Sequence, residues 1–185
     1  MKLLRYITFL SVIVCFLASC ETVPITGRSQ LSLVSDSQMN AMSFDYYKDF
    51  LSKNKLSKNQ AQTQQVKNVG TRIANAVTRF FTQQGQANRV AGYKWEFNLV
   101  ESSEMNAWCL PGGKVVVYTG ILPITKDEAG LAVVMGHEIA HAVADHGKER
   151  MSQGLLTQMG GTALSVALSQ QPAATSALFM QAYGI

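Results

Sequence analysis

Apolar side chains recur at helical spacing in the first half of the chain. Residues 35–52 and residues 60–84 each predict an amphipathic helix, because their apolar positions fall on one face at 3.6 residues per turn. These positions include Met39, Met42, Tyr46 and Phe50 in the first segment and Val66, Val69, Ile73, Val77, Phe80 and Phe81 in the second. Gly85 is placed to end the second helix, and residues 53–59 form a polar connection.

A pattern of period two follows these helices. In residues 93–99 the apolar side chains of Tyr93, Trp95, Phe97 and Leu99 alternate with polar ones, which predicts a half-buried strand. Residues 114–118 are rich in valine and predict a second strand. Residues 110–113, Leu-Pro-Gly-Gly, have the composition of a turn between them.

The second half of the chain is predicted to be helical. No proline interrupts residues 124–171, and a helix is expected from about Lys126 to Gly147, with Thr125 as its N-cap and Glu128 completing a capping box. Residues 152–185 contain no charged residue and no histidine. Glycines at 160–161 and the segment 170–172 predict breaks, and we expect this stretch to pack on the preceding helix, because its glutamines and serines disfavour a membrane span.

The pentad His137-Glu138-Ile139-Ala140-His141 lies on this predicted helix. Residues four apart lie about 40° apart around a helix and about 6 Å apart along it, so both imidazoles can reach one metal ion. The pattern is typical of zinc metalloproteases, with His137 and His141 as ligands of one Zn²⁺ and Glu138 as general base. The alternative is a helix that carries these residues by chance, whose polar cluster would then need other partners. On a continuous helix His146 lies about 180° from His137, which predicts a surface residue.

The N-terminus is similar to that of an exported lipoprotein. Lys2 and Arg5 precede an apolar run over residues 6–18, and small residues lead to Cys20. We expect residues 1–20 to be a lipoprotein signal peptide with lipid attached to Cys20, residues 21–34 to be a tether, and residues 35–185 to be one domain. An ordinary signal peptide or an N-terminal anchor helix is the alternative.

Charge and cysteine content exclude other classes. The formal net charge of +4 includes Lys2 and Arg5, and no basic stripe predicts nucleic-acid binding. Cys109 is the one cysteine after Cys20, so no internal disulfide is expected. A small buried residue is the preferred interpretation of Cys109 over a catalytic thiol.

Residues 106–120, Asn-Ala-Trp-Cys-Leu-Pro-Gly-Gly-Lys-Val-Val-Val-Tyr-Thr-Gly, combine with the pentad into a recognisable pair. Together they resemble the zinc metallopeptidase family of HtpX, the CAAX prenyl protease and Oma. The closest branch is that of bacterial periplasmic lipoproteins such as BepA and LoiP. The resemblance covers about residues 35–185. It implies an α+β, mainly helical, zincin-like metalloprotease domain with a small antiparallel sheet beside the pentad helix.

The resemblance also assigns site residues. His137 and His141 would bind zinc, and Glu138 would be the base. The strand at 114–118 would be the edge to which an extended substrate adds. The residues implied in substrate binding are Asn106, Gly112, Gly113, Val115 and Val117.

One part of the family's site is not found in the sequence. The family takes its third zinc ligand from a glutamate on a later helix, and this chain has no carboxylate after Glu149. Asp145 lies about 80° and 12 Å from His137 on a continuous helix, too far to share the metal. We therefore expect a C-terminally truncated member, with a natural two-histidine protein as the alternative.

The implied function is zinc-dependent endopeptidase activity on envelope proteins, in protein quality control. The implied partners are unfolded or misfolded proteins, and the membrane through the N-terminal lipid. The alternative is an inactive, lipid-anchored binding or chaperone-like protein. The expected location is the bacterial cell envelope facing the periplasm, and Glu21 after Cys20 favours the outer membrane over the inner one.

Overall fold

The computed structural model describes residues 20–23, 27–160 and 163–185. The predicted signal peptide therefore lies outside the described residues, apart from Cys20 at its end. Lipid attachment to Cys20 stays a prediction. Within the described part of the chain, no helix is long and apolar enough to cross a membrane.

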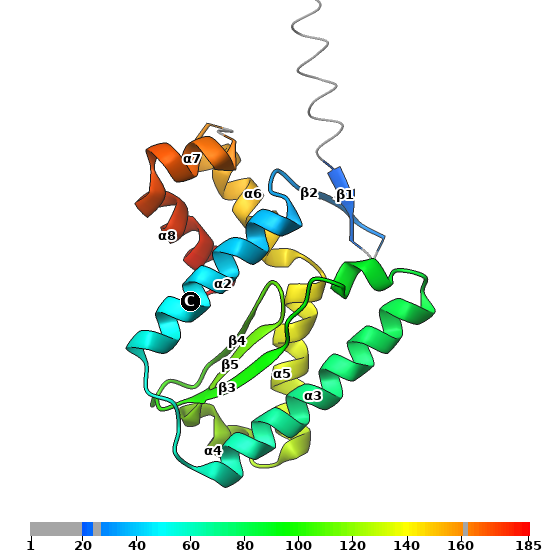
Figure 1. Ribbon diagram of the computed structural model, residues 1–185, viewed down its shortest axis with the longest axis vertical. Coiled ribbons are helices and arrows are strands. Elements are labelled where there is room, and N and C mark those ends of the chain that lie inside the picture. The colour runs from blue at the N-terminus through cyan, green and yellow to red at the C-terminus, as the bar shows by residue number, and fades with distance from the viewer. Residues whose placement is uncertain (1–19, 24–26, 161–162) are drawn as a thin grey trace, which may run out of the picture.

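Helices dominate the structure, and a small sheet lies among them (Figure 1), which confirms the predicted α+β, mainly helical class. The helices are α2 (Asp36–Lys53), α3 (Gln60–Gln83), α4 (Leu122–Thr125), α5 (Glu128–Val143), α6 (His146–Gln158), α7 (Leu164–Gln170) and α8 (Pro172–Tyr183), with short 3-10 helices η1 (Ala87–Val90) and η2 (Thr119–Ile121). The strands are β1 (Cys20–Thr22), β2 (Ser29–Leu31), β3 (Glu96–Val100), β4 (Ala107–Leu110) and β5 (Lys114–Tyr118).

The first two long helices begin and end close to their predicted bounds. The side chain of Ser35 accepts a hydrogen bond from the backbone of Gln38, which completes a capping box before α2. Asn59 caps α3, and Gly85, with φ of +69°, follows its end. The strand predicted at residues 93–99 begins later, at Glu96, and ends at Val100.

The sheet has the order β3–β5–β4, with β5 in the centre. β4 pairs with β5 in antiparallel fashion, but β3 pairs with β5 in parallel, with Phe97 opposite Val115. The predicted antiparallel sheet is therefore wrong for one of its two strand pairs. An alternating pattern identifies a strand but carries no signal for its direction, which depends on where the β4–β5 hairpin docks.

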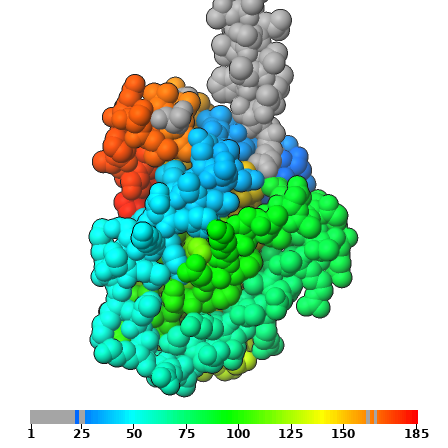
Figure 2. Space-filling model, in the orientation of Figure 1, coloured from blue at the N-terminus to red at the C-terminus, as the bar shows by residue number. Residues whose placement is uncertain are grey.

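Every residue of β5 is buried, and successive side chains enter different cores. Val115 and Val117 pack in a core with α3 and α5, whereas Val116 and Tyr118 pack in a second core with α2, α6 and α8. The helices thus cover both faces of the sheet (Figure 1). Figure 2 shows one face, where green residues of the sheet region stay visible between α2 and α3.

The C-terminal segment breaks where the sequence predicts, between α6 and α7 and again before Pro172. Its packing differs from the prediction, because α8 lies on α6 and in the second core rather than on α5. The contact is close at two glycines. A Cβ on Gly154 would lie 2.8 Å from the Leu178 side chain, and one on Gly147 would lie 2.0 Å from the Tyr183 ring.

The predicted tether at residues 21–34 contains a hairpin of β1 and β2 that docks on the domain. Arg28 donates two hydrogen bonds, at 2.8 and 2.6 Å, to the carboxylate of Glu149 on α6. Arg89 donates to the carbonyl oxygen of Thr22 at 3.2 Å. These contacts hold the hairpin beside the start of α6.

Gly70 allows α3 to approach the sheet, since a Cβ there would lie 2.3 Å from the Phe97 ring. We predict that Gly70→Ala lowers the free energy of unfolding by about 1–3 kcal/mol through overpacking. Gly136→Ala is the matched control, because a Cβ at that position on α5 meets nothing within 4 Å. It should stabilise by up to about 1 kcal/mol through helix propensity. Urea unfolding of both variants is the measurement, and equal effects would contradict the packing argument.

Candidate metal centre

The pentad lies on α5, which starts later than predicted. Asp127, rather than Thr125, is the N-cap, and its side chain accepts a hydrogen bond from Gly130 N at 2.8 Å. The reason is the short helix α4, which ends at Thr125 and is followed by Lys126 at φ of +64°. The chain therefore turns once more before α5 can begin, and the predicted capping box does not form.

His137 and His141 face one another, as the spacing predicts. Their Nε2 atoms are 3.0 Å apart, and their ring planes meet at 86°. The opposite side of α5 carries the buried residues Leu131, Met135 and Ile139, which pack in the core with the sheet. Burial of this stripe turns His137 toward solvent. The predicted juxtaposition of the two nitrogens is confirmed, and their role as metal ligands stays a prediction.

Glu138 is half-buried next to the first histidine. Burial raises the pKa of its carboxyl group above the ordinary 4.5, while the positive charges of His137 and Arg150 act in the opposite direction. A carboxylate with a raised pKa binds a proton more readily, which suits a general base. Burial, together with His137, His146 and Arg150, lowers the pKa of His141. The neutral imidazole that a metal ion needs is therefore favoured.

His146 differs from its prediction. The helix does not continue past the pentad, because α5 ends at Val143 and Asp145 adopts a left-handed conformation with φ of +58°. α6 starts at His146 in a new direction, and Nδ1 of His146 lies 2.6 Å from Nδ1 of His141. The angle calculated for a continuous helix does not apply. The signal in the sequence was Asp145, one of the residue types that tolerate this conformation.

Arg150 is a residue that the sequence did not single out. Its Nε donates to the carbonyl oxygen of Ala182 at 2.5 Å, which connects α6 to the end of α8. Its charge also lowers the pKa values of Glu138 and His141. No motif indicated this contact, since the residues involved are far apart in the sequence.

The donor set fits part of a zinc site. Two converging Nε2 atoms are suitable ligands, and catalytic zinc normally takes three protein ligands and one open position. Among the residues that the structure describes, no group of three or more metal-binding side chains gathers. The carboxylates nearest in sequence have other partners, because Asp145 pairs with Arg89 at 3.2 Å and Glu149 pairs with Arg28.

The predicted substrate edge needs correction. Val115 and Val117 belong to β5, which has a strand on each side and offers no free edge. The strand at the border of the sheet beside α5 is β4, which follows Asn106. Gly112 and Gly113 form the turn between β4 and β5. The resemblance identified the segment, but strand order is a tertiary property that it did not specify.

Cys109 lies on β4 within the core and is buried. Burial raises the pKa of its thiol, with a contribution from the charge of Glu138. The thiolate, which is the reactive form, is therefore disfavoured. These observations agree with the interpretation of Cys109 as a small buried residue.

Comparison with known proteins identifies the family. The model of peptidase family M48 matches residues 60–184. The chain belongs to peptidase family M48. The resemblance based on the pentad and residues 106–120 is thereby confirmed.

Several curated M48-like relatives are metalloendopeptidases by name. The chain is 34% identical over 142 residues to mitochondrial metalloendopeptidase OMA1 of Schizosaccharomyces pombe, a match that covers 75% of this chain and 39% of the relative. It is 30% identical over 141 residues to human OMA1, covering 75% and 26%. It is 29% identical over 131 residues to the beta-barrel assembly-enhancing protease of Escherichia coli, covering 71% and 25%. The chain thus spans well under half the length of these relatives.

The relatives correct the predicted location. The OMA1 proteins are named as mitochondrial, so the prediction of a bacterial envelope location with the outer membrane favoured is wrong. The similarity to the bacterial protease, at 29% identity, is lower than that to the OMA1 of fission yeast. The prediction rested on the first 21 residues, which lie outside the segment that defines the family.

The ion pair between Arg28 and Glu149 generates a pH-dependent prediction. Arg28 lowers the pKa of Glu149 below its ordinary 4.5, so the stabilisation is present above 4.5 and is lost as the pH falls through the lowered pKa. Glu149→Gln should lower the melting temperature at neutral pH, and the difference from the parent should close in acid. Thermal melts at both pH values test this, with Glu104→Gln as the control at an exposed carboxylate. A difference that persists in acid would contradict the assignment.

Proposed function

We propose that this chain carries the catalytic helix of a zinc-dependent endopeptidase that hydrolyses internal peptide bonds in unfolded or damaged proteins. The observation that carries the proposal is the 3.0 Å approach of the Nε2 atoms of His137 and His141, with Glu138 next to the first. Membership of family M48 supports a metallopeptidase role. The alternative of an inactive binding protein is not favoured, because the named relatives are proteases.

The residues of α5 would divide the chemistry between them. His137 and His141 would hold the zinc ion as two of its ligands. When bound, zinc polarises the scissile carbonyl group and lowers the pKa of water. Glu138 would take a proton from the attacking water and deliver it to the leaving amine. Burial of Glu138 favours the first of these steps, since its raised pKa increases the affinity of the carboxylate for the proton of water.

The outer edge of β4 is the surface that we propose for the substrate backbone. Tyr118 N donates to Asn106 O at 3.1 Å, so Asn106 and Tyr118 form a hydrogen-bonded pair of the antiparallel ladder. Such pairs alternate, and the backbone groups of Ala107 and Cys109 therefore face away from β5. The side chain of Asn106 accepts from Ala107 N at 2.8 Å, which occupies one of these outward groups. A substrate carbonyl would replace this side-chain oxygen.

Recognition through the backbone explains the proposed substrate class. An added strand binds mainly through main-chain hydrogen bonds, so its sequence matters less than its extended conformation. Folded proteins protect their strand edges, whereas unfolded segments offer free backbone groups. The edge at β4 therefore favours unfolded over folded substrates, which supports a role in protein quality control.

The decisive variant is Glu138→Gln in the full-length protein. We predict a loss of about 10²–10⁴-fold in kcat/KM on casein with zinc content unchanged, because the amide cannot accept the proton. Glu128→Gln is the control, since Glu128 is an exposed carboxylate on the same helix, about 15 Å away along its axis. A Glu138→Gln variant that retains zinc and cleaves casein at the parental rate would rule out the proposed mechanism.

Metal removal tests the ligands. We predict that chelation of the full-length protein abolishes casein cleavage and that added zinc restores it. His137→Ala and His141→Ala should each lose bound zinc, measured by atomic absorption, because two ligands are then left at most. His137 is exposed, so its replacement should leave the melting temperature of the metal-free protein almost unchanged. Full zinc occupancy in either variant would disprove the assignment.

A further inference from the structure

The two ring nitrogens of His141 have different neighbours. Nε2 lies 3.0 Å from Nε2 of His137, and Nδ1 lies 2.6 Å from Nδ1 of His146. The two nitrogens occupy different sides of one imidazole ring. The side that faces His137 is the side for a shared metal ion, and the other side is in hydrogen-bond contact with His146.

We propose that His146 is a positioning residue, which accepts a hydrogen bond from Nδ1–H of His141 and fixes that ring for metal binding. The inference rests on the proposed zinc site. A neutral imidazole that binds metal through Nε2 carries its proton on Nδ1, so His141 must be the donor. His146 then accepts with Nδ1 and carries its own proton on Nε2. Metal-binding histidines normally have such a partner, which fixes the tautomer and the ring orientation.

The alternative role for His146, as the third ligand of the same ion, disagrees with the geometry. Its Nδ1 contacts the side of the His141 ring that faces away from His137. In the described part of the chain, these histidines do not form a group of three that could hold one ion. His146 therefore acts on the metal through His141.

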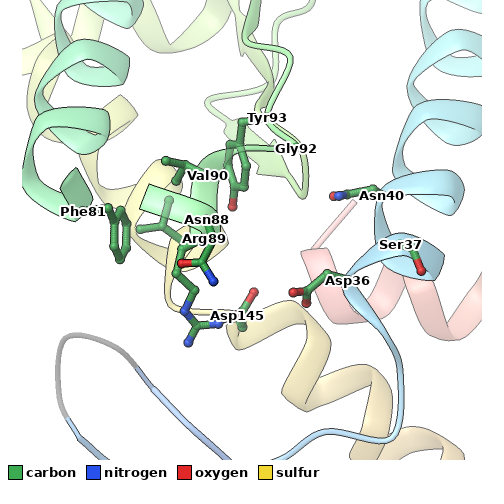
Figure 3. A pocket seen from close by; sticks show the side chains of 11 residues that line it. Asp36, Ser37, Asn40, Phe81, Asn88, Arg89, Val90, Gly92, Tyr93 and Asp145 are labelled. Atoms are coloured by element: carbon green, nitrogen blue, oxygen red, sulfur yellow. Dashed lines mark hydrogen bonds and ion pairs between the residues drawn. The ribbon is translucent and has the colours of Figure 1, made fainter. Parts of the chain in front are cut away.

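The turn between α5 and α6 determines where His146 lies. Asp145 adopts its left-handed conformation directly before His146, and Arg89 of η1 binds its carboxylate at 3.2 Å. Figure 3 shows Arg89 and Asp145 side by side at the start of α6, with Asp36 of α2 nearby. Lys148 Nζ binds the Asp36 carboxylate at 2.7 Å and approaches Asp145 at 4.0 Å. Arg89 of η1 and Lys148 of α6 thus contact Asp145 at this turn, and Asp36 of α2 binds Lys148.

Further contacts restrict the movement of this turn. The Tyr93 hydroxyl group donates to the carbonyl oxygen of Ala142 at 3.4 Å, close to the end of α5. Gly147 lies directly against the Tyr183 ring, where no Cβ would fit. One tyrosine thus contacts the end of α5, and another packs on the start of α6. These contacts restrain the backbone at His146, so that its ring can hold the ring of His141 in one orientation.

Zinc affinity of two His146 variants in the full-length protein tests the proposal. His146→Asn keeps a polar acceptor near the position of Nδ1, and His146→Leu keeps bulk without an acceptor. We predict that His146→Leu weakens zinc binding by about 10–100-fold in competition with a chromogenic chelator. His146→Asn should stay within about threefold of the parent, and this rescue distinguishes positioning from packing.

The outcomes separate this proposal from the proposed function. Parental zinc affinity in His146→Leu, or equal losses in both variants, would overturn the positioning role while Glu138→Gln could still show the predicted loss of activity. A parent protein that binds no zinc would overturn both.

Nuclear magnetic resonance of the zinc-loaded parent gives a test that needs no variant, in case His146→Leu does not fold. A coupling between Nδ1 of His141 and Nδ1 of His146 across the hydrogen bond is expected. A Nδ1–H of His141 that exchanges freely with water would overturn the proposal.

Discussion

Burial of β5 on both faces and between two strands is the constraint on which the rest of the structure depends. Each fully buried valine contributes about 1.5–3 kcal/mol from the removal of apolar surface from water. Val115 and Val117 pack against the apolar stripe of α5, and Val116 packs in the second core with α2, α6 and α8. With one side of α5 committed to the sheet, the two histidines four residues apart must lie together on the other side. The juxtaposition of the two imidazoles is thus a consequence of core packing.

Asp145, in its left-handed conformation, lies between α5, which packs in the core with α3, and α6, which packs in the second core. If α5 continued through residue 146, His146 would lie about 180° from His137, far from the other imidazoles. The break instead sends α6 back along the second core, where α8 packs on it at Gly147 and Gly154. The same turn thereby determines the surroundings of His141 and the position of the C-terminal helices. Arg89 and Lys148, which contact Asp145, contribute to both.

Strand order decides which backbone a substrate could reach. β5 is richest in valine, yet its two neighbours pair with it fully, and β4 keeps the free edge beside α5. The side chains of β4 are buried, including Cys109, so the strand presents backbone rather than side chains at this edge. This arrangement suits the recognition of extended chains of varied sequence. The turn after β4 needs glycines for a separate reason, since Gly112 and Gly113 have φ of +74° and +83° and a Cβ there would lie 2.6 Å from the Phe44 ring and 2.8 Å from the Trp95 ring.

The sequence by itself determined the two long helices, predicted at residues 35–52 and 60–84 and observed at 36–53 and 60–83, together with the valine-rich strand, the pentad and the family. These features rest on local spacing, because helical period, strand alternation and the separation of two histidines by four residues are properties of neighbouring positions. Only the tertiary structure decided the parallel pairing of β3, the edge position of β4, the N-cap at Asp127 and the contact of His146 with His141. Each of these depends on which distant segments pack together, and a turn at one residue, Asp145, redirects everything that follows it.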